Sequence, residues 1–386
     1  MTKYWNKIKE KFVNENGIVS IGISDIIGSG LSGIFWLYIA SVIDPGDYGE
    51  IHYFLGIAGM AQIFSMFGNP HALTVYSAKN ENIQSTLFLL SIIPTIVSSI
   101  IIFIIFTRFD TALLVIGYVI FESVNSVILG RKFYRKYAKN ILIQKSLTII
   151  LGIIFFYAFG PSGIIFALVL TFIPHLTIFV KEFKTTKINF SLLKNKKKFI
   201  INNYFLTISG GFGGQIDKII LAPLLGFTIL GNYSLALQIF TILVMFSSVA
   251  FKFLLPQDAS GFSNKKIKKF VILVSIVISI LGFTVLPKII PLIFPKFIDT
   301  IDAIGIMSLA VIPEAVTMLC MSQMLGQEKS KFILIVKLLS LFTIIVGFII
   351  MGPIFGIVGL AWIFVLASVL QASLLFISTK MEYIKK

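Results

Sequence analysis

Charged residues are scarce in this chain, at 13% of its 386 residues, while hydrophobic residues make up 57% and the mean hydropathy is +0.96. Soluble domains carry about 25% charged residues and are about 45–50% apolar. The composition therefore excludes an ordinary soluble protein and predicts one that crosses a membrane many times.

Cysteine and histidine are nearly absent as well. The single cysteine, Cys320, excludes an internal disulfide and any cysteine-based metal cluster. The three histidines, His52, His71 and His175, do not have the spacing of metal ligands. The stretch GSGLSG (28–33) fits a dinucleotide fingerprint but falls inside a predicted span rather than between a strand and a helix. We therefore expect no metal, no cofactor and no catalytic residues.

Apolar runs long enough to cross a bilayer, about 20 residues each, dominate the rest of the chain. We predict about twelve, at residues 18–43, 48–76, 85–107, 111–130, 140–159, 162–181, 198–224, 227–255, 270–290, 303–325, 332–351 and 355–379. Residues 1–17 carry apolar side chains at helical spacing among lysines, which predicts a short amphipathic helix on the membrane surface.

Basic residues are distributed very unevenly over the two sides of these spans. On one side lie 26 of the 33 lysines and arginines, together with both termini. The other side holds few basic residues against six acids. The positive-inside rule then places both termini in the cytoplasm and predicts a multi-pass protein of the plasma (inner) membrane. Lysines next to anionic lipid account for the net charge of +16, so we expect no nucleic-acid partner.

The two halves of the chain repeat one another. VIFESV (119–124) recurs as VIPEAV (311–316), and ILIQK (141–145) recurs at the same offset as ILIVK (333–337). Nearer the start of each half, residues 35–49 align with 217–231, and Gly49 matches Gly231. Six spans per half is an even number, so both copies enter from the same side and the repeats are parallel.

The predicted fold is therefore an all-α integral membrane protein of about twelve transmembrane helices, in two parallel six-helix repeats around a central cavity. The expected boundaries are an amphipathic N-terminus at 1–17, a first lobe at 18–181, a cytoplasmic linker at 182–197 and a second lobe at 198–386.

Polar side chains inside spans are costly and usually face a bundle interior or a water-filled cavity. The polar and small residues of the first span (18–43) and of the seventh span (198–224) recur at helical spacing, so each set forms a stripe on one face of its helix. A seam of small residues between packed helices is the alternative reading of these two stripes. The candidates for a substrate or ion cavity are Asp25, Ser29, Ser32, Glu122, Asn125, Asn203, Thr207, Asp217, Lys218 and Glu314.

Two lysines recur together with two of these acids. Lys145 and Lys337 follow Glu122 and Glu314 at equivalent positions. We predict structural charge pairs, with direct substrate contact or proton carriage as the alternatives. Lys218 has no counterpart, because Trp36 occupies the equivalent position. It could serve a task that the first half does not share, pair with Asp217, or reach out to the interface.

Several segments resemble the polysaccharide (O-antigen type) flippases of the MATE/lipid II flippase (MOP) superfamily. They are LYIASVIDPGDYGEI (37–51), LGRKFYRKYAKNILIQKSL (129–147), QIDKIILAPLLGFTILGNYSLALQI (215–239) and PLIFPKFIDTIDAIGIMSLAVIP (291–313). The resemblance implies two six-helix lobes and the movement of polyprenyl-pyrophosphate-linked oligosaccharides from the inner to the outer leaflet. The lipid II branch carries two further spans and several cavity arginines, whereas this chain has arginine only at 108, 131 and 135.

The predicted function is thus a flippase for a polyprenyl-(pyro)phosphate-linked oligosaccharide in cell-surface polysaccharide biosynthesis, working by alternating access with ion coupling. Its expected partners are the lipid-linked substrate, membrane lipids and H⁺ or Na⁺, with the protein as a monomer. A MATE-type cation or drug antiporter is the nearest alternative. A membrane-embedded glycan polymerase or ligase fits less well, because no predicted external segment exceeds roughly a dozen residues; we expect no enzymatic activity.

Overall fold

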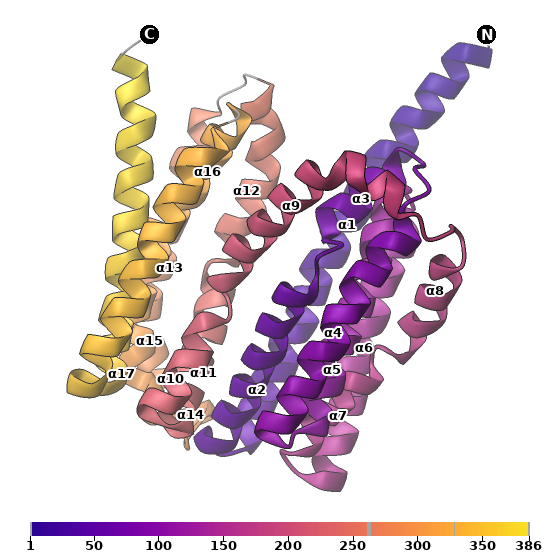
Figure 1. The fold of residues 1–386 in the computed structure, drawn as a ribbon. Coiled ribbons are helices and arrows are strands. Elements are labelled where there is room, and N and C mark those ends of the chain that lie inside the picture. The colour runs from indigo at the N-terminus through magenta and orange to yellow at the C-terminus, as the bar shows by residue number, and fades with distance from the viewer. Residues whose placement is uncertain (1, 261–263, 328, 385–386) are drawn as a thin grey trace. The chain divides into compact units, whose positions relative to one another are not determined.

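The computed structural model describes residues 2–260, 264–327 and 329–384, which form helices and no strand (Figure 1). By packing, these residues divide into two compact units. The first unit contains the residues up to Phe35 together with Phe54–Gln215. The second contains Trp36–Tyr53 together with the residues from Ile216 onward. These units are defined by packing and not by the sequence repeat, so the lobe boundary expected at 182–197 stays a prediction.

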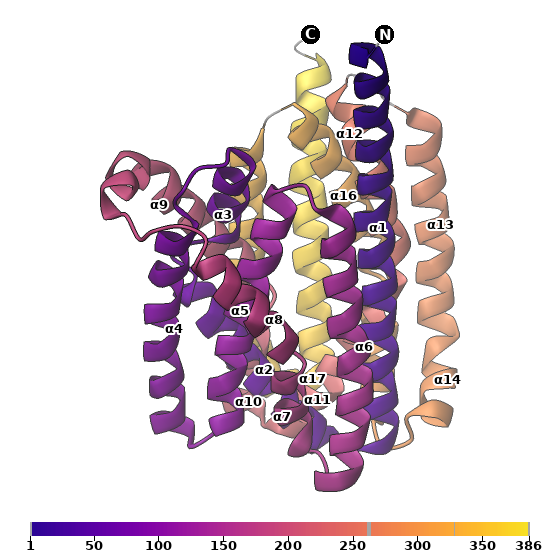
Figure 2. The same cartoon turned by 90° about the vertical axis from the view of Figure 1, so that its right-hand side faces the viewer.

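The first unit is built from the helices that precede Ile216, all of which are rich in apolar residues. They are α1 (Thr2–Val42) up to Phe35, α2 (Pro45–Ser65) from Phe54, α3 (Pro70–Ala78), α4 (Gln84–Phe106), α5 (Phe109–Gly130), α6 (Tyr134–Phe159), α7 (Gly163–Leu170), α8 (Ile173–Phe183) and α9 (Phe190–Phe212). Helix α5 packs against α3, α4, α6, α7 and α8 (Figure 2). In an 18-residue apolar stretch of each helix, 67% of the residues are buried in α5, against 28% in α4 and 17% in α6. Helix α5 is the central helix of this unit.

The second unit has the same plan around the tenth span. Its helices are α10 (Ile216–Leu225), α11 (Phe227–Leu243), α12 (Met245–Ala259), α13 (Lys265–Thr284), α14 (Leu286–Ile293), α15 (Thr300–Ser308), α16 (Val311–Gly326) and α17 (Ser330–Ile384). The pair α15–α16 packs against α11, α12, α13, α14 and α17. The repeat aligns this pair with α5, so the same span is central in both units.

Several predicted spans are broken in the middle. Seven helices of the described chain are long and apolar enough to cross a membrane, and three bent pairs raise that number to ten. The bends are 49° between α2 and α3, 46° between α11 and α12, and 44° between α15 and α16. Proline begins α3 and α8 (Pro70 and Pro174), because it lacks the amide hydrogen that a helix interior needs.

Helix α17 contains the last two predicted spans. Its backbone is non-helical at Gly356, with φ 57° and ψ −142°, a conformation open essentially to glycine alone. Ser340 Oγ donates to the Ala367 carbonyl at 3.3 Å, and Gly347 packs against Ile363, so the two arms run antiparallel. With α17 counted as two spans, the described chain supplies eleven spans; the span expected at 198–224 corresponds to α9 and α10, which belong to different units.

The N-terminal stretch is helical, as expected, and belongs to the same helix as the first span. Residues 2–17 are helical but continue without a break into the first span as part of α1. Proline is absent from this region, and no other residue interrupts the backbone hydrogen bonds between the two segments. The apolar span itself begins at Gly22, and the surface location expected for residues 1–17 stays a prediction.

Candidate functional site

A tyrosine joins two of the predicted site acids inside the first unit. Tyr137, in the first turn of α6, hydrogen-bonds through its side chain to Asp25 of α1 and also interacts electrostatically with Glu122 of α5. Asp25 and Glu122 are both half-buried. The structure thus places two acids from the expected cavity set around one hydroxyl group. Sequence reasoning missed Tyr137, because residue 137 lies between the spans predicted at 111–130 and 140–159.

A buried polar network lies next to these acids. The Asn140 amide nitrogen reaches the Asn125 carbonyl oxygen at 3.4 Å, which links α6 to α5. One turn further, Gln144 Nε2 lies 3.1 Å from Thr148 Oγ1 and 3.3 Å from Thr171 Oγ1. All five side chains are at most 6% exposed. Of this set, the sequence identified Asn125 alone as a site residue.

His175 closes the network on the α8 side. It is 1% exposed, and its ring meets the Phe121 ring edge-to-face at 4.8 Å between centroids. Within the described part of the chain, His175 Nδ1 and Gln144 Oε1 have no hydrogen-bond partner among protein atoms. Buried polar atoms are normally paired, and spare capacity of this kind is what a water or a transported ion uses.

The second unit does not duplicate this network. At the 192-residue offset of the repeat, Asn140 and Gln144 correspond to Phe332 and Val336. Both of those side chains are apolar and pack in the hydrophobic cluster around Met324. The pair of buried amides from Asn140 and Gln144 is therefore specific to the first unit, although both copies retain a glutamate on the central span, and Thr317 and Ser340 are buried polar residues at the positions equivalent to Asn125 and Thr148.

The two expected charge pairs behave differently. Glu314 and Lys337 interact electrostatically in the second unit. In the described residues Glu122 and Lys145 form no ion pair, and Glu122 faces Tyr137 instead. The stem of Lys145 packs against α1, where a Cβ on Gly28 would lie 3.5 Å from Lys145 Cγ. The structural roles predicted for Lys145 and Lys337 stay predictions.

The remaining candidates of the first unit bond locally or face outward. Asn203 Nδ2 donates to the Phe199 carbonyl at 2.8 Å, and Thr207 Oγ1 donates to the Asn203 carbonyl at 2.9 Å, so both serve the α9 backbone. On α1, Ser29 is exposed and Ser32 is half-buried. Asn203 and Thr207 thus satisfy their side-chain hydrogen bonds within α9, and the cavity role expected for the two stripes stays a prediction.

In the second unit the polar candidates gather near the start of α10. Asp217 is 6% exposed and accepts a hydrogen bond from the Lys218 amide at 2.9 Å. Lys218 interacts electrostatically with His52, whose ring lies 4.8 Å from the Trp36 ring. Trp36 is the repeat equivalent of Lys218, so both equivalent positions interact with the same histidine. Among the described residues, no group of three histidine, cysteine or acidic side chains could hold a metal ion.

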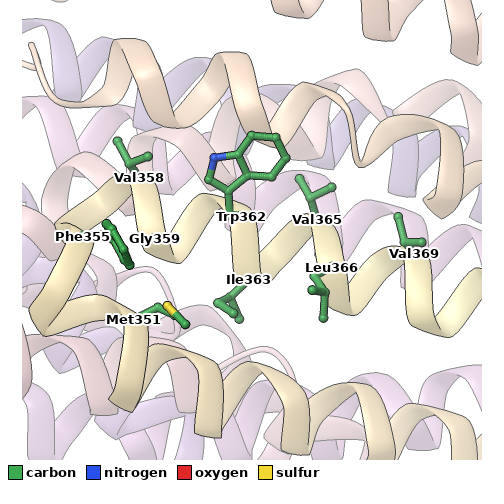
Figure 3. A pocket seen from close by; sticks show the side chains of 9 residues that line it. All are labelled: Met351, Phe355, Val358, Gly359, Trp362, Ile363, Val365, Leu366 and Val369. Carbon is green, nitrogen blue, oxygen red and sulfur yellow. The ribbon is translucent and has the colours of Figure 1, made fainter.

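An apolar groove runs along the second arm of α17, within the second unit. It has a volume of about 620 Å³ and is lined by Met351, Phe355, Val358, Gly359, Trp362, Ile363, Val365, Leu366 and Val369 (Figure 3). Trp362 and Leu366 are more than half exposed. Large exposed apolar side chains are expected where a helix faces lipid rather than water.

Comparison with known proteins identifies the family. A family model described as polysaccharide biosynthesis protein matches residues 15–257, which is more than half of the chain. No curated protein matches the sequence.

Solved structures of low sequence identity share the fold. The lipid II flippase MurJ in an inward closed conformation has a TM-score of 0.75 at 13% identity, over 94% of this chain and 87% of its own. An inward-facing multidrug resistance MATE family transporter of the MOP superfamily has a TM-score of 0.71 at 14% identity, over 95% and 98%. An outward-facing transporter of the same description reaches 0.60 at 15% identity, over 95% of both chains. The chain is a multi-pass membrane protein with the fold of the MOP superfamily, and it belongs to the polysaccharide biosynthesis protein family.

Proposed function

We propose that this protein flips a polyprenyl-(pyro)phosphate-linked oligosaccharide from the cytoplasmic to the outer leaflet by alternating access. The match to the polysaccharide biosynthesis protein family over residues 15–257 carries the proposal, because it joins a glycan pathway to a transporter fold. A sugar head bearing phosphates cannot cross about 30 Å of hydrocarbon unaided. A hydrated path through the protein replaces the water shell of the head while the polyprenyl tail stays in lipid.

The first unit supplies the ion-coupling groups in this proposal. Asp25, Tyr137 and Glu122 form a connected set that can hold a proton or a small cation. The network from Asn125 to His175 offers the spare hydrogen-bond capacity that a hydrated ion needs. Since the second unit lacks this network, ion binding is assigned to the first unit and Glu314 of the second to structural pairing with Lys337.

A transport assay on the purified protein tests the function. Proteoliposomes containing a fluorescent lipid-linked oligosaccharide should show protein-dependent movement of the sugar head, read by its accessibility to an impermeant quencher. An imposed H⁺ or Na⁺ gradient should change the rate. Empty liposomes and liposomes with the Asp25→Asn, Glu122→Gln double variant are the controls. Equal rates in all three preparations would refute the flippase.

A cation or drug antiporter of the same fold is the second candidate. The likeness to multidrug resistance MATE transporters and the half-buried acids Asp25, Glu122 and Glu314 favour it. The same proteoliposomes loaded with a cationic dye separate the two functions. Dye efflux driven by an ion gradient, without movement of the lipid-linked sugar, would establish the antiporter. Sugar transfer between lipid carriers, read by chromatography of the products, would reveal an enzyme instead.

The proposed orientation places both termini in the cytoplasm of a plasma-membrane protein that acts as a monomer. It follows from the lysines concentrated on one side of the predicted spans. Single cysteines in a Cys320→Ser background, at position 3 and at position 296, should label from opposite sides in intact cells. Labelling of position 3 but not of position 296 from outside would reverse the orientation.

A further inference from the structure

A pocket of about 480 Å³ lies within the first unit, between α3 and the N-terminal part of α9. We call it the basic pocket; its defining side chains are Tyr76, Lys79, Lys196, Lys198, Phe199 and Asn202. Figure 2 shows the start of α9 beside α3, at one end of the unit. The volume lies within the range of about 300–1,000 Å³ that is common for small-molecule sites.

Several contacts hold the two walls of the basic pocket together. Asn69 is fully buried and caps α3 through its Oδ1, while its Nδ2 donates to the Ile200 carbonyl of α9 at 3.0 Å. The rings of Tyr76 and Phe199 meet edge-to-face at 5.6 Å. The linker before α9 is fixed as well, because the Asn189 amide donates to Thr86 Oγ1 at 2.9 Å. The pocket is therefore built into the fold.

The charged side chains that line the basic pocket are all lysines, and one acid next to it, Glu81, pairs with one of them. Lys196 forms a salt bridge with Glu81, and its ammonium lies 4.5 Å from the centre of the Tyr76 ring. Within the described part of the chain, neither Lys79 nor Lys198 pairs with a carboxylate. Two exposed ammonium groups thus remain available to a ligand, beside the amide of Asn202.

The chemistry of these groups identifies the class of ligand. Lysine binds phosphate oxygens as a point charge, and an amide nitrogen adds a hydrogen bond to the same oxygens. The aromatic rings and Val75 supply an apolar wall, which suits a phosphate attached to hydrocarbon better than a free anion. The pocket also lies at the end of the unit where the lysine-rich segments gather, which the sequence places at the cytoplasmic membrane surface.

We propose that the basic pocket binds the phosphate groups of a lipid headgroup at the cytoplasmic membrane surface. Two lipids share this chemistry, the isoprenoid-linked (pyro)phosphate substrate and bulk anionic phospholipid. Only the first identification rests on the proposed function; in that case the pocket is the site where the substrate head first docks. The second identification makes it a site for the surrounding membrane.

Binding of geranylgeranyl diphosphate to the full-length protein in phosphatidylcholine nanodiscs tests the proposal. The Lys79→Gln, Lys198→Gln double variant should bind at least about tenfold more weakly, since each lysine near a phosphate contributes on the order of 1 kcal/mol. The Lys194→Gln, Lys197→Gln double variant removes the same charge from exposed positions on the same helix outside the pocket. It should bind as the wild type does. Equal affinity in the two double variants would overturn the proposal.

Lysine footprinting gives an answer that does not depend on either variant folding. With wild-type protein, acetylation read by mass spectrometry should slow at Lys79 and Lys198 when the diphosphate is added, but not at Lys194 and Lys197. If the diphosphate changed the acetylation rate of all four lysines equally, or of none of them, the pocket would be contradicted. Phosphatidylglycerol added to the nanodiscs distinguishes the two lipids. If it competes with the diphosphate, the site binds bulk phospholipid headgroups; if it does not compete, the site is assigned to the isoprenoid lipid.

The result of the diphosphate-binding test is independent of the result of the flipping assay. Diphosphate binding lost in the Lys79→Gln, Lys198→Gln variant would support the pocket even if wild-type protein moved no lipid-linked sugar. Conversely, wild-type flipping with equal binding in both double variants would leave the flippase standing and remove the pocket.

Discussion

Gly49 and Gly231 pack backbone to backbone within the second unit. A Cβ on Gly49 would overlap the carbonyl oxygen of Phe227, and a Cβ on Gly231 would overlap that of Pro45. Phe227 lies four residues before Gly231, and Pro45 lies four residues before Gly49. Each glycine therefore contacts the turn that precedes the other glycine, and the contact is reciprocal. The sequence repeat aligns Gly49 with Gly231, and the structure brings this equivalent pair together across a local two-fold relation.

Substitution of either glycine should therefore destabilise the protein. We expect Gly49→Ala or Gly231→Ala to lower the free energy of unfolding by about 1–3 kcal/mol or more, because neither opposing carbonyl can move aside. Reversible unfolding in detergent, followed by circular dichroism, measures the change. Gly30→Ala is the matched control, since nothing lies within 4 Å of its added Cβ. Equal effects at all three positions would contradict the close packing.

Tyr137 should matter for ion coupling rather than for folding. Tyr137→Phe removes the hydroxyl group that joins it to Asp25 and leaves the ring in place. We expect a reduced dependence of the flipping rate on the imposed ion gradient, with an unchanged melting temperature. Thr207→Val is the comparison, because that hydroxyl bonds only to its own helix at Asn203. Full coupling in Tyr137→Phe would remove the tyrosine from the ion site.

The two glutamate–lysine pairs should give different double-mutant cycles. Glu314 and Lys337 interact, so Glu314→Gln with Lys337→Met should show a coupling energy of about 0.5–3 kcal/mol. Glu122 faces Tyr137 instead, so Glu122→Gln with Lys145→Met should be additive within about 0.5 kcal/mol. Unfolding free energies of the single and double variants provide both values. A large coupling in the first unit would restore the clamp that the sequence suggested.

A buried ion pair at the start of α13 should be sensitive to removal of its cation. Lys268 Nζ lies 2.7 Å from Asp258 Oδ1, whose other oxygen accepts from Ser322 Oγ at 2.7 Å; the Asp258 side chain is 3% exposed. Lys268→Met should cost about 3–5 kcal/mol of unfolding free energy, because it strands a buried carboxylate. Adding Asp258→Asn should recover most of that loss. Lys269→Met, on the exposed side of the same helix turn, should have little effect.

The length of most spans could be predicted from hydropathy, but the breaks inside them could not. The prediction 85–107 corresponds to α4 (Gln84–Phe106) and 111–130 to α5 (Phe109–Gly130). Helix α6 begins at Tyr134 rather than at residue 140, because it extends beyond the apolar run into a basic segment. The bend between α11 and α12 lies at Val244, where the sequence has no proline or glycine, so the usual sequence signals of a kink do not predict it.

The sequence singled out the charged residues of the candidate site and Asn125, but not the amides Asn140 and Gln144. Glu122 and Asp25 stand out in a hydrophobic span because their burial is costly. Asn140 and Gln144 lie on a helix whose first turns carry many charges, and an uncharged amide there gives no comparable signal. Their importance appears only when α5, α6 and α8 pack together and bury them.

The turn at Gly356 has a consequence for how the protein is made. A single non-helical residue separates the last two membrane-crossing arms, so no polar loop exists to wait at the far surface while the second arm is synthesised. Spanning structures must satisfy their backbone groups internally in lipid, and a connection this short keeps the two arms side by side. We therefore expect the two arms to enter the bilayer together as a helical hairpin.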